Sequence, residues 1–424
     1  MKIAIIGAGI AGNVAAYKLH PKHDITVFES GAYVGGHTNT VAVHENGREY
    51  AVDTGFIVFN DRTYPNFIRI LDEIGQEYQP SEMSFSVQAE DDGIEYCGTT
   101  LNSLFAQRRN IIRPPFYRMV RDILRFNRSM ASGVEQLDPS QLLSSYVVEN
   151  GYSREFADNY LIPMAAAIWS AEPRSILEMP VEFLVRFFAN HGLLQVRDRP
   201  VWRVIKGGSR QYVDKLVAAH RDRIRLNSPV QSIRRAGDHV EVQSASGGKE
   251  VFDYVFVACH SDQALALLKD ATALERQVLG AIKYQPNQAI LHTDDSLMPR
   301  RRRAWAAWNY HIPRDATRHV AVTYNMNILQ GLKTNHQYLV TLNNDQYINP
   351  DKILRTVQYE HPIYSQEAVA AQKRQADLNG DRTFFCGAYW RNGFHEDGVV
   401  SALNALGCFE ERLSNEKLHL RRAG

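Results

Sequence analysis

The chain has 424 residues but only four cysteines, which stand far apart at Cys97, Cys259, Cys386 and Cys408. None belongs to a CxxC pair or has the spacing of a zinc ligand, so neither a disulfide framework nor a structural metal site is indicated. Unpaired thiols are typical of proteins in a reducing compartment. We therefore expect a cytoplasmic protein that binds no metal.

The sequence also lacks an excess of either charge. Its 48 lysines and arginines balance 47 aspartates and glutamates, so no global field draws nucleic acid to it. No run approaches the roughly 20 apolar residues of a membrane-spanning helix, and the short apolar N-terminal run lacks the cleavage site of a signal peptide. The motifs G-x-S-x-G, HExxH and Walker A are missing as well, which argues against hydrolysis and phosphoryl transfer.

Glycine, by contrast, is concentrated near the N-terminus. The apolar run over 3–6 predicts a buried parallel strand, and Gly7, Gly9 and Gly12 follow it in the spacing G-x-G-x-x-G. The first glycine permits a tight turn, the second leaves room for a pyrophosphate, and the third lets the next helix pack closely on the sheet. This spacing predicts a dinucleotide-binding turn; a bend without a ligand is the alternative.

The residues after the glycines support the same prediction. A helix is expected over 10–20, and its N-terminus offers phosphates free N–H groups and a positive dipole end. A second buried strand over 25–30 closes with Glu29. That acid stands about twenty residues after the glycines, where a carboxylate accepts a hydrogen bond from a ribose hydroxyl. An acid here argues against a 2′-phosphate.

Three further segments favour FAD over NAD. "ESGAYVGGHTNT" contains the adjacent glycines Gly35 and Gly36, which bring a second backbone segment to the ligand. "YAVDTGFIVFN" predicts a strand followed by D-T-G-F. "RTFFCGAYWRNGFHEDGVVSALNALG" predicts a strand over 383–386, a turn at Gly387 and a helix that begins near 397–399.

Together these motifs resemble those of the flavin amine oxidase and phytoene desaturase superfamily. The chain is similar to bacterial amine-oxidase-like flavoproteins, some of which resemble desaturases of fatty acyl chains. The resemblance implies FAD as the cofactor and an α/β fold, with a Rossmann-type, glutathione-reductase-like FAD-binding domain and an interleaved α+β substrate domain. The FAD-binding domain is predicted over 1–74, 200–270 and 376–424, and the substrate domain over 75–199 and 271–375.

The resemblance also implies roles for single residues. Those assigned to FAD are Gly7, Gly9, Ala11, Gly12, Glu29, Ser30, Gly35, Gly36, His37, Thr38, Gly55, Phe56, Val230, Gly387, Asp397, Gly398 and Val399. Those placed at the substrate pocket are Phe56, Trp169, Tyr389, Trp390 and Phe394. Many members of the family have arginine at the position of His37, and the backbone at Val230 meets the adenine. The family's lysine near flavin N5 has only Lys283 as a candidate here.

The intervening segments are more apolar and more basic. Residues 159–173 and 181–194 predict helices whose apolar faces form core or line a substrate tunnel. A helix is also expected over 114–128, with Phe116, Met119, Val120, Ile123 and Leu124 on one face and Arg118, Arg121, Arg125 and Arg128 elsewhere. Such a basic amphipathic helix can lie on anionic lipid; a solvated surface helix is the alternative.

We predict an FAD-dependent oxidoreductase that removes a hydride from a C–H bond of a hydrophobic substrate, with a fatty acyl chain or lipid preferred. Flavin N5 would take the hydride from a carbon about 3–3.5 Å away, without a protein acid or base. One alternative is a flavin amine oxidase acting on a small amine or polyamine, which predicts a compact aromatic cage. Others are a non-catalytic or redox-linked FAD-binding protein, and an NAD-binding protein without flavin.

Overall fold

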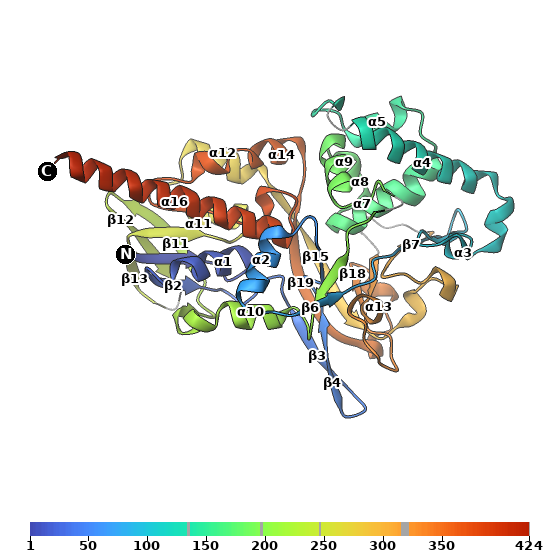
Figure 1. The fold of residues 1–424 in the computed structure, drawn as a ribbon, viewed down its shortest axis with the longest axis horizontal. Coiled ribbons are helices and arrows are strands. Elements are labelled where there is room, and N and C mark those ends of the chain that lie inside the picture. The colour runs from blue at the N-terminus through green and yellow to red at the C-terminus, as the bar shows by residue number, and fades with distance from the viewer. Residues whose placement is uncertain (134–135, 196–197, 246, 315–321, 424) are drawn as a thin grey trace.

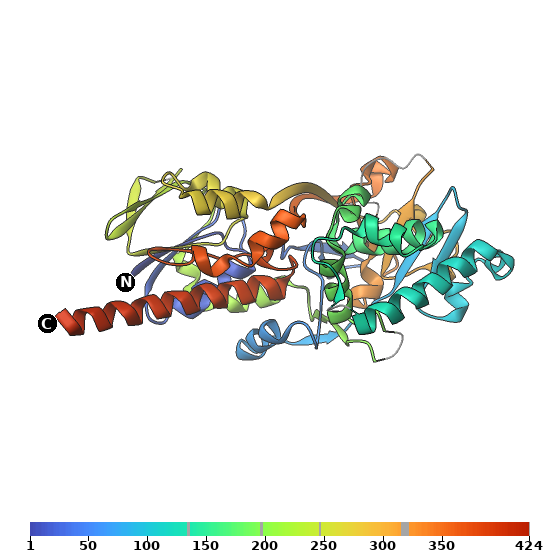
Figure 2. The same cartoon turned by 90° about the horizontal axis from the view of Figure 1, so that it is seen from above.

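The structure is a computed structural model that describes residues 1–133, 136–195, 198–245, 247–314 and 322–423. The predicted domain ranges include the few remaining positions, which lie outside the described residues. The molecule is elongated, and both termini lie near one end of its long axis (Figure 1). The molecule has two parts along this axis, and a view turned by 90° shows both, with the long C-terminal helix lying along the part that contains the termini (Figure 2).

The N-terminal strand is the central strand of a five-stranded sheet with the order β10-β2-β1-β14-β20. Every neighbouring pair is parallel. The strands are β10 (Ile224–Arg225), β2 (Asp24–Phe28), β1 (Lys2–Ile6), β14 (Tyr254–Val257) and β20 (Thr383–Phe385). Because β1 and β14 are covered on both faces, they are apolar almost throughout. The predicted strands over 3–6, 25–30 and 383–386 are therefore present.

Two helices pack on one face of this sheet, α1 (Ile10–Leu19) and α16 (His395–Ala423). Two more pack against them, α2 (Pro65–Glu73) against α16 and α10 (Arg210–Leu216) against α1. A Cβ on Gly12 would collide with the carbonyl oxygen of Gly7, so only glycine lets α1 begin this close to the turn. The core between α1, α16 and the sheet includes Val14, Phe256 and Phe384, which are fully buried.

The opposite face of the parallel sheet packs against an antiparallel meander, as the alternating pattern predicts. It consists of β11 (Val230–Ala236), β12 (His239–Ser244) and β13 (Lys249–Phe252). Four further helices complete this side: α11 (Ser261–Leu267), α12 (Ala273–Ala281), α14 (Gln366–Gln372) and α15 (Gln375–Leu378).

The other part of the molecule is built on a seven-stranded sheet with the order β19-β15-β18-β17-β16-β7-β8. Its strands are β19 (Ile353–Ile363), β15 (Lys283–His292), β18 (Leu339–Leu342), β17 (Val322–Asn325), β16 (Trp308–Ile312), β7 (Phe85–Ala89) and β8 (Ile94–Cys97). Here β15 and β19 form a long antiparallel ribbon. This ribbon extends from the seven-stranded sheet toward the helices α12 and α14 (Figure 1).

Short strands join the two parts. They are the hairpin β3 (Thr40–Glu45) and β4 (Arg48–Asp53), and the small sheet β5 (Val58–Asn60), β9 (Trp202–Ile205) and β6 (Tyr78–Pro80). The buried carboxylate of Asp53 accepts hydrogen bonds from the side chains of Thr40, Ser209 and Gln330. Gln330 ends α13 (Met326–Gln330), so this carboxylate ties β4 to the rim of the seven-stranded sheet.

A group of helices covers one face of the seven-stranded sheet. They are α4 (Pro114–Gly133), α5 (Leu143–Glu149), α6 (Arg154–Phe156), α7 (Ile162–Trp169), α8 (Pro173–Leu177) and α9 (Val181–Asn190). Helices are present in the segments predicted over 159–173 and 181–194, but both end earlier than predicted: the first ends at Trp169, where Ser170 has a left-handed backbone, and the second ends at Asn190. Within the described residues, no helix combines the length and the apolar character needed to cross a bilayer.

Candidate active site

A cavity of about 380 Å³ lies where the glycine turn, the β15–β19 ribbon and the segment before α16 meet. It brings together residues from both ends and from the middle of the chain. The predicted residues that line it are Gly7, Gly9, Ala11, Glu29, Ser30, Gly35, Gly36, His37, Gly55, Phe56, Trp169, Gly387, Tyr389 and Phe394. The motifs thus converge on one cavity at the carboxyl ends of the parallel strands, the usual place for a ligand in such a sheet.

The glycine turn forms one wall of the cavity. Gly7 has a positive φ of 102°, and a Cβ on Gly9 would meet no atom within 4 Å, so Gly9 faces open space. The Glu29 carboxylate accepts hydrogen bonds from the backbone N–H of Ala8 at 2.8 Å and of Gly31 at 2.7 Å. Glu29 therefore holds the turn and the following loop together while it also lines the cavity.

The second glycine pair abuts the first turn. The N–H of Gly35 donates to the carbonyl oxygen of Ala8 at 2.9 Å. Gly36 has a φ of 58°, and a Cβ there would lie 3.2 Å from the Cα of Gly9. Two backbone segments without side chains thus meet at one edge of the cavity. This is the cradle that a diphosphate requires, because its oxygens must approach backbone N–H groups closely.

His395, a buried histidine that the sequence did not lead us to assign, contacts both Phe56 and Thr38. The ring of His395, at the start of α16, stacks on Phe56 with centroids 3.5 Å apart. Its Nε2 lies 2.9 Å from both Thr38 Oγ1 and Tyr212 OH. Burial lowers the pKa of His395 to about 3, so the ring is neutral at pH 7. Thr38 is therefore tied to this buried network rather than exposed to the cavity.

Seven other predicted residues do not line the cavity, most of them because they are buried behind it; Val230 is half-buried at the start of β11. The seven are Gly12, Thr38, Val230, Trp390, Asp397, Gly398 and Val399. Trp390 was expected in the substrate pocket but is only 3% exposed, because it packs beside Tyr389 in the core with Val255 and Phe385. A Cβ on Gly398 would lie 2.6 Å from the Cγ2 of Ile10, so α16 begins in close contact with α1.

Asp397 lies in the first turn of α16. Its Oδ2 accepts a hydrogen bond from the backbone N–H of Phe394 at 2.9 Å, and Oδ1 lies 3.8 Å from Arg391. Burial raises the pKa of Asp397 to about 7, because the charged form loses its hydration. The protonation of this carboxyl group therefore changes near neutral pH.

Three histidines from distant segments form a cluster in the cavity wall. His37 follows the second glycine pair, His260 follows β14, and His361 belongs to β19. The ring centroid of His37 is 5.3 Å from that of His361 and 6.2 Å from that of His260. Tyr359 stacks on His37 at 4.8 Å. His37 was predicted from the second glycine pair, whereas His260 and His361 were not assigned; the position of His260 shortly after the apolar strand β14 was a signal that could have pointed to it.

A chain of hydrogen bonds defines the tautomer of His361. The backbone N–H of Gln288 donates to Asn343 Oδ1 at 2.7 Å, and Asn343 Nδ2 donates to Asn287 Oδ1 at 2.6 Å. Asn287 Nδ2 then donates to His361 Nδ1 at 2.8 Å. Because a backbone N–H can only donate, both amide orientations follow, and His361 carries its proton on Nε2. Burial lowers its pKa to about 4, so it is neutral at pH 7.

Several polar atoms of the lining are buried and have no hydrogen-bond partner among the described residues. They are His37 Nε2, Trp308 Nε1, Tyr364 OH and Tyr389 OH; His260 Nδ1, also buried, lies 3.5 Å from Glu360 Oε2. Buried polar groups are nearly always paired in folded proteins. Their convergence on a cavity with a glycine cradle therefore fits a large polar and aromatic ligand such as FAD.

The charge of the cavity wall is low. Its carboxylates are Glu29 and Glu360, and no lysine or arginine lines it within the described ranges. Lys283, the candidate for a lysine near the flavin, is exposed on β15 and does not line the cavity. It is therefore not placed for that role.

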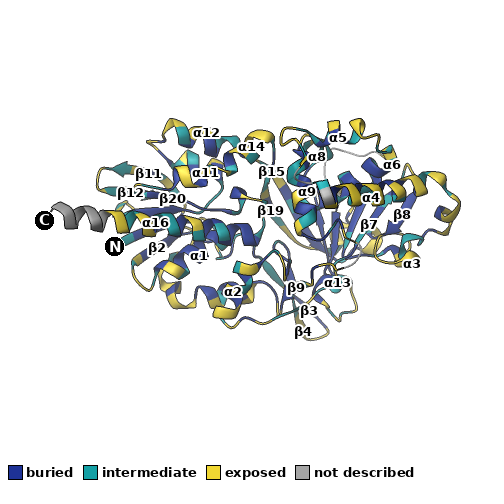
Figure 3. Cartoon of the chain, turned by 45° about the horizontal axis from the view of Figure 1, so that its top comes forward, coloured by how far each residue is buried: buried dark blue, intermediate teal, exposed yellow. Residues whose placement is uncertain are grey.

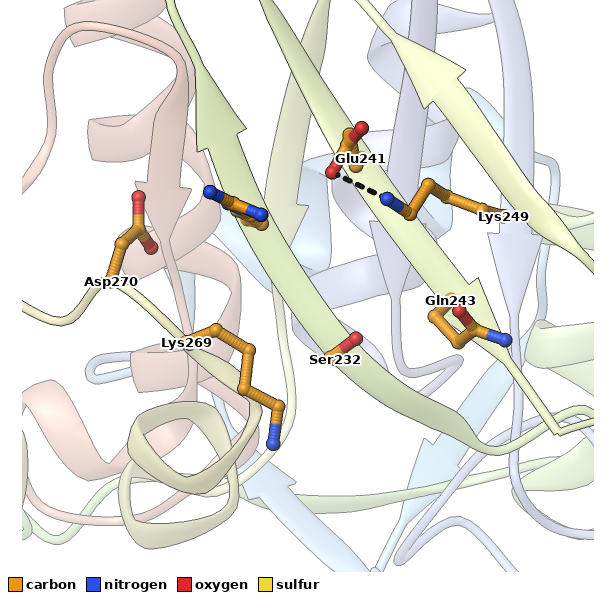
Figure 4. Close-up of a pocket in the computed structure, with 7 residues that line it drawn as sticks. Ser232, Glu241, Gln243, Lys249, Lys269 and Asp270 are labelled. Atoms are coloured by element: carbon orange, nitrogen blue, oxygen red, sulfur yellow. Dashed lines mark hydrogen bonds and ion pairs between the residues drawn. The ribbon is translucent and has the colours of Figure 1, made fainter.

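A second depression lies on the face of the three-stranded meander (Figure 4). It is lined by Ser232, Arg234, Glu241, Gln243, Lys249, Lys269 and Asp270. Three of its charged groups have local partners: Lys249 contacts Glu241 at 3.0 Å, and Asp270 contacts Arg235 at 3.0 Å. None of the predicted site residues lines it, and we assign no ligand to it.

Comparisons with known proteins agree with this geometry. The family model described as flavin containing amine oxidoreductase matches residues 10–302, more than half of the chain. No curated protein matches the sequence. Among solved structures, cyclohexylamine oxidase from Brevibacterium oxydans IH-35A is 16% identical, with a TM-score of 0.69 and coverage of 97% of this chain and 99% of that one.

Two further structures share the fold. Wild-type putrescine oxidase bound to putrescine is 14% identical, with a TM-score of 0.68 and coverage of 97% of this chain and 99% of the oxidase. A fatty acid isomerase from P. acnes that produces CLA is 16% identical, with a TM-score of 0.64 and coverage of 94% and 96%. The chain therefore belongs to the flavin containing amine oxidoreductase family and is an FAD-dependent oxidoreductase.

Proposed function

We propose that the enzyme oxidises a C–H bond of a long apolar substrate. The preferred substrate class is a fatty acyl chain or another lipid. The observation that supports this most is the wall opposite the glycine turns. It is apolar and aromatic, with Ile168, Trp169, Trp308, Tyr324, Leu342 and Phe394. Together with the lack of lysine and arginine in the described lining, this wall offers an acyl chain apolar contact without a cost for burying charge.

The glycine side of the cavity would hold the cofactor. Gly7, Gly9 and Ala11 would lie against the diphosphate, Glu29 against a ribose, and His37 near the ribityl chain. We further propose that the five-stranded parallel sheet and its helices are a glutathione-reductase-like FAD-binding domain. When bound, FAD supplies a hydride acceptor. The protein then has to place the reacting carbon and exclude water, and the aromatic wall serves both tasks.

The test is the visible spectrum of the purified holoenzyme without oxygen, before and after adding a fatty acyl phospholipid. Bleaching of the flavin by the lipid supports the proposal. Leu342→Trp would fill part of the apolar wall and slow bleaching, whereas the same change at Leu354, which is 47% exposed on β19, leaves it unchanged. Equal effects of the two variants would argue against this cavity as the acyl site.

Amine oxidation is the second candidate. It is favoured by the aromatic rings of Trp169, Tyr359, Tyr364 and Tyr389 and by the carboxylate of Glu360, all in the lining. A ring of aromatic side chains attracts an ammonium group through cation–π contacts. Bleaching by an amine and not by lipid would select this reaction. A stoichiometric flavin that neither donor reduces would instead support a non-catalytic FAD-binding protein.

A further inference from the structure

Exposed apolar side chains are concentrated in one short part of the described chain. Twelve large hydrophobic residues are exposed, and five of them are Leu101, Ile111, Ile112, Tyr117 and Leu124. Leu101 is 77% exposed and Ile112 is 82% exposed. Single exposed apolar residues are common on protein surfaces, but several within 24 residues indicate an interaction surface.

The helix α4 has two different faces. Phe116, Met119, Phe126 and Met130 are buried in the core of the helical part. The apolar face that the sequence predicted for lipid contact is therefore mostly turned inward, because it packs against the neighbouring helices and the seven-stranded sheet. Figure 3 shows exposed residues along the outward side of α4.

That outward side carries a different stripe. Tyr117, Arg121, Leu124 and Arg128 are all exposed and follow one another at intervals of four, three and four residues. This spacing places them on one face of a helix. The stripe alternates basic and apolar side chains. This pattern suits a binding partner whose surface carries charged groups over an apolar layer.

The segment before α4 continues the stripe. Tyr117 OH donates to the carbonyl oxygen of Ile111 at 2.9 Å, which joins α4 to the short helix η1 (Arg108–Ile112). Arg108 donates to Asn102 Oδ1 at 2.6 Å, which joins η1 to α3 (Leu101–Leu104). The resulting surface, called here the basic tip, consists of Leu101, Arg108, Arg109, Ile111, Ile112, Tyr117, Arg121 and Leu124. It lies at the end of the long axis away from both termini (Figures 1 and 2).

The charge around the basic tip is strongly positive. Residues 101–128 contain seven arginines and one acid, Asp122, which is buried and lies 3.6 Å from both Arg121 and Arg125. A second acid, Glu155, pairs with Arg118. Arg109 and Arg113 also contact the turn between β7 and β8, which carries Asp91 and Asp92, by donating to the carbonyl oxygens of Gly93 and Asp92. With these two acids counted, the seven arginines still outnumber the nearby carboxylates, so the tip attracts anionic surfaces although the whole chain is nearly neutral.

We propose that the basic tip docks on an anionic phospholipid membrane. Arginines bind lipid phosphates, while Leu101, Ile112 and Leu124 enter the boundary between headgroups and acyl chains. Tyr117 is the one aromatic side chain named in the tip, and its OH is bound to the carbonyl oxygen of Ile111; the other apolar members are aliphatic and offer no stacking to nucleic acid bases, which favours lipid over a polynucleotide. The tip projects at the end of the molecule, as insertion into a bilayer surface requires. This docking is independent of the substrate proposed above.

The experiment is sedimentation of the holoenzyme with phosphatidylcholine vesicles, with and without phosphatidylglycerol. We expect binding only to the anionic vesicles, and release by salt at about 0.5 M because screening shortens the reach of the charges. Arg121→Glu and Ile112→Asp should each weaken binding roughly tenfold, since each basic group near such a surface contributes about a factor of five and the apolar contact is lost.

Two controls make the same chemical changes elsewhere. Lys22→Glu removes an exposed positive charge far from the tip, and Val148→Asp alters a residue that is 79% exposed on α5. Both should bind vesicles within about twofold of the wild type, because neither lies on the tip. Thermal unfolding of all variants establishes that they are folded.

Three results would overturn the proposal. The first is no sedimentation of the wild type with anionic vesicles at low salt. The second is an equal loss in the tip variants and the controls. The third is binding to single-stranded DNA that depends on Arg121 while vesicle binding is unaffected by Ile112→Asp, because this would identify a polynucleotide surface instead.

Discussion

The two walls of the cavity differ in the groups that form them, backbone in one wall and side chains in the other. The wall at Gly7, Gly9, Gly36 and Gly55 is backbone, and at three of these glycines a Cβ would lie within about 3.2 Å of other backbone atoms. The opposite wall is made of large side chains from separate elements, among them Trp169 on α7, Trp308 on β16 and Tyr324 on β17. The backbone wall fits one shape of ligand. Substitutions in the side-chain wall, by contrast, can alter which ligand binds there.

This contrast teaches where the specificity of such an enzyme lies. A backbone cradle binds a cofactor common to a family, since it requires glycine at defined positions. A side-chain wall sets the substrate, because its volume and polarity vary with each residue. Variants in the two walls should therefore differ in kind as well as in size.

The largest effect is expected for Gly12→Val. Its Cβ would overlap the carbonyl oxygen of Gly7, so α1 could not remain in place. The free energy of unfolding should fall by more than about 4 kcal/mol, and most of the protein should be recovered unfolded. Denaturant unfolding of the cofactor-free protein measures this. A stable Gly12→Val protein would mean that α1 can shift away from the turn.

Gly9→Val should act on the cofactor alone. The cavity leaves its side chain free of protein atoms, so the cofactor-free protein should unfold at the wild-type denaturant concentration. FAD should bind at least roughly 100-fold more weakly, because the valine would stand where the diphosphate approaches the turn. Fluorescence titration with FAD tests this, and retention of wild-type affinity would contradict the proposed cradle.

A smaller loss is expected for Glu29→Gln. The carboxylate accepts two backbone N–H bonds in addition to its proposed ribose contact. Replacing a charged acceptor by an amide should weaken FAD binding about tenfold, equivalent to about 1.4 kcal/mol. Glu73→Gln serves as the control, since it makes the same change on α2 away from the cavity lining. An equal loss in both variants would show that the effect is not specific to the Glu29 charge.

Asp397 should make stability depend on pH. Its pKa is raised to about 7 in the folded protein, so the folded state binds the proton more tightly than the unfolded chain. The free energy of unfolding should therefore decrease as pH rises from about 4 to about 7, and Asp397→Asn should remove that decrease, a few kcal/mol at most. Unfolding of the two cofactor-free proteins measured from about pH 4 to about pH 8 checks this, and parallel curves would contradict it.

The smallest effect is expected on the KM of the substrate, where substitutions of two tryptophans should differ. Trp308→Phe replaces a large ring of the apolar wall by a smaller one and should raise the KM of the substrate about threefold, consistent with a loss of apolar contact of less than about 1 kcal/mol. Trp390→Phe should leave KM unchanged, because Trp390 lies behind the lining. A larger KM effect at Trp390 than at Trp308 would reverse this assignment.

Much of the cofactor side was predictable from local patterns. The glycine turn, its two strands, the helix between them and Glu29 all lie within 30 residues, so their spacing alone indicates the structure. The helix α16 begins at His395, two residues before the predicted start. Trp390 was misplaced because its neighbour Tyr389 lines the cavity, and only packing decides which of two adjacent aromatic rings turns into the core.

The sequence by itself determined the elements of the nucleotide fold and their order, since turn geometry and burial on both faces of a strand depend on nearby residues. Only the tertiary structure decided that His37, His260 and His361 meet, that Asn287 and Asn343 define a tautomer, and that the apolar face of α4 is buried while Tyr117, Arg121 and Leu124 face outward. These contacts join residues up to several hundred positions apart. Their partners are chosen by the packing of whole sheets, which no local pattern records.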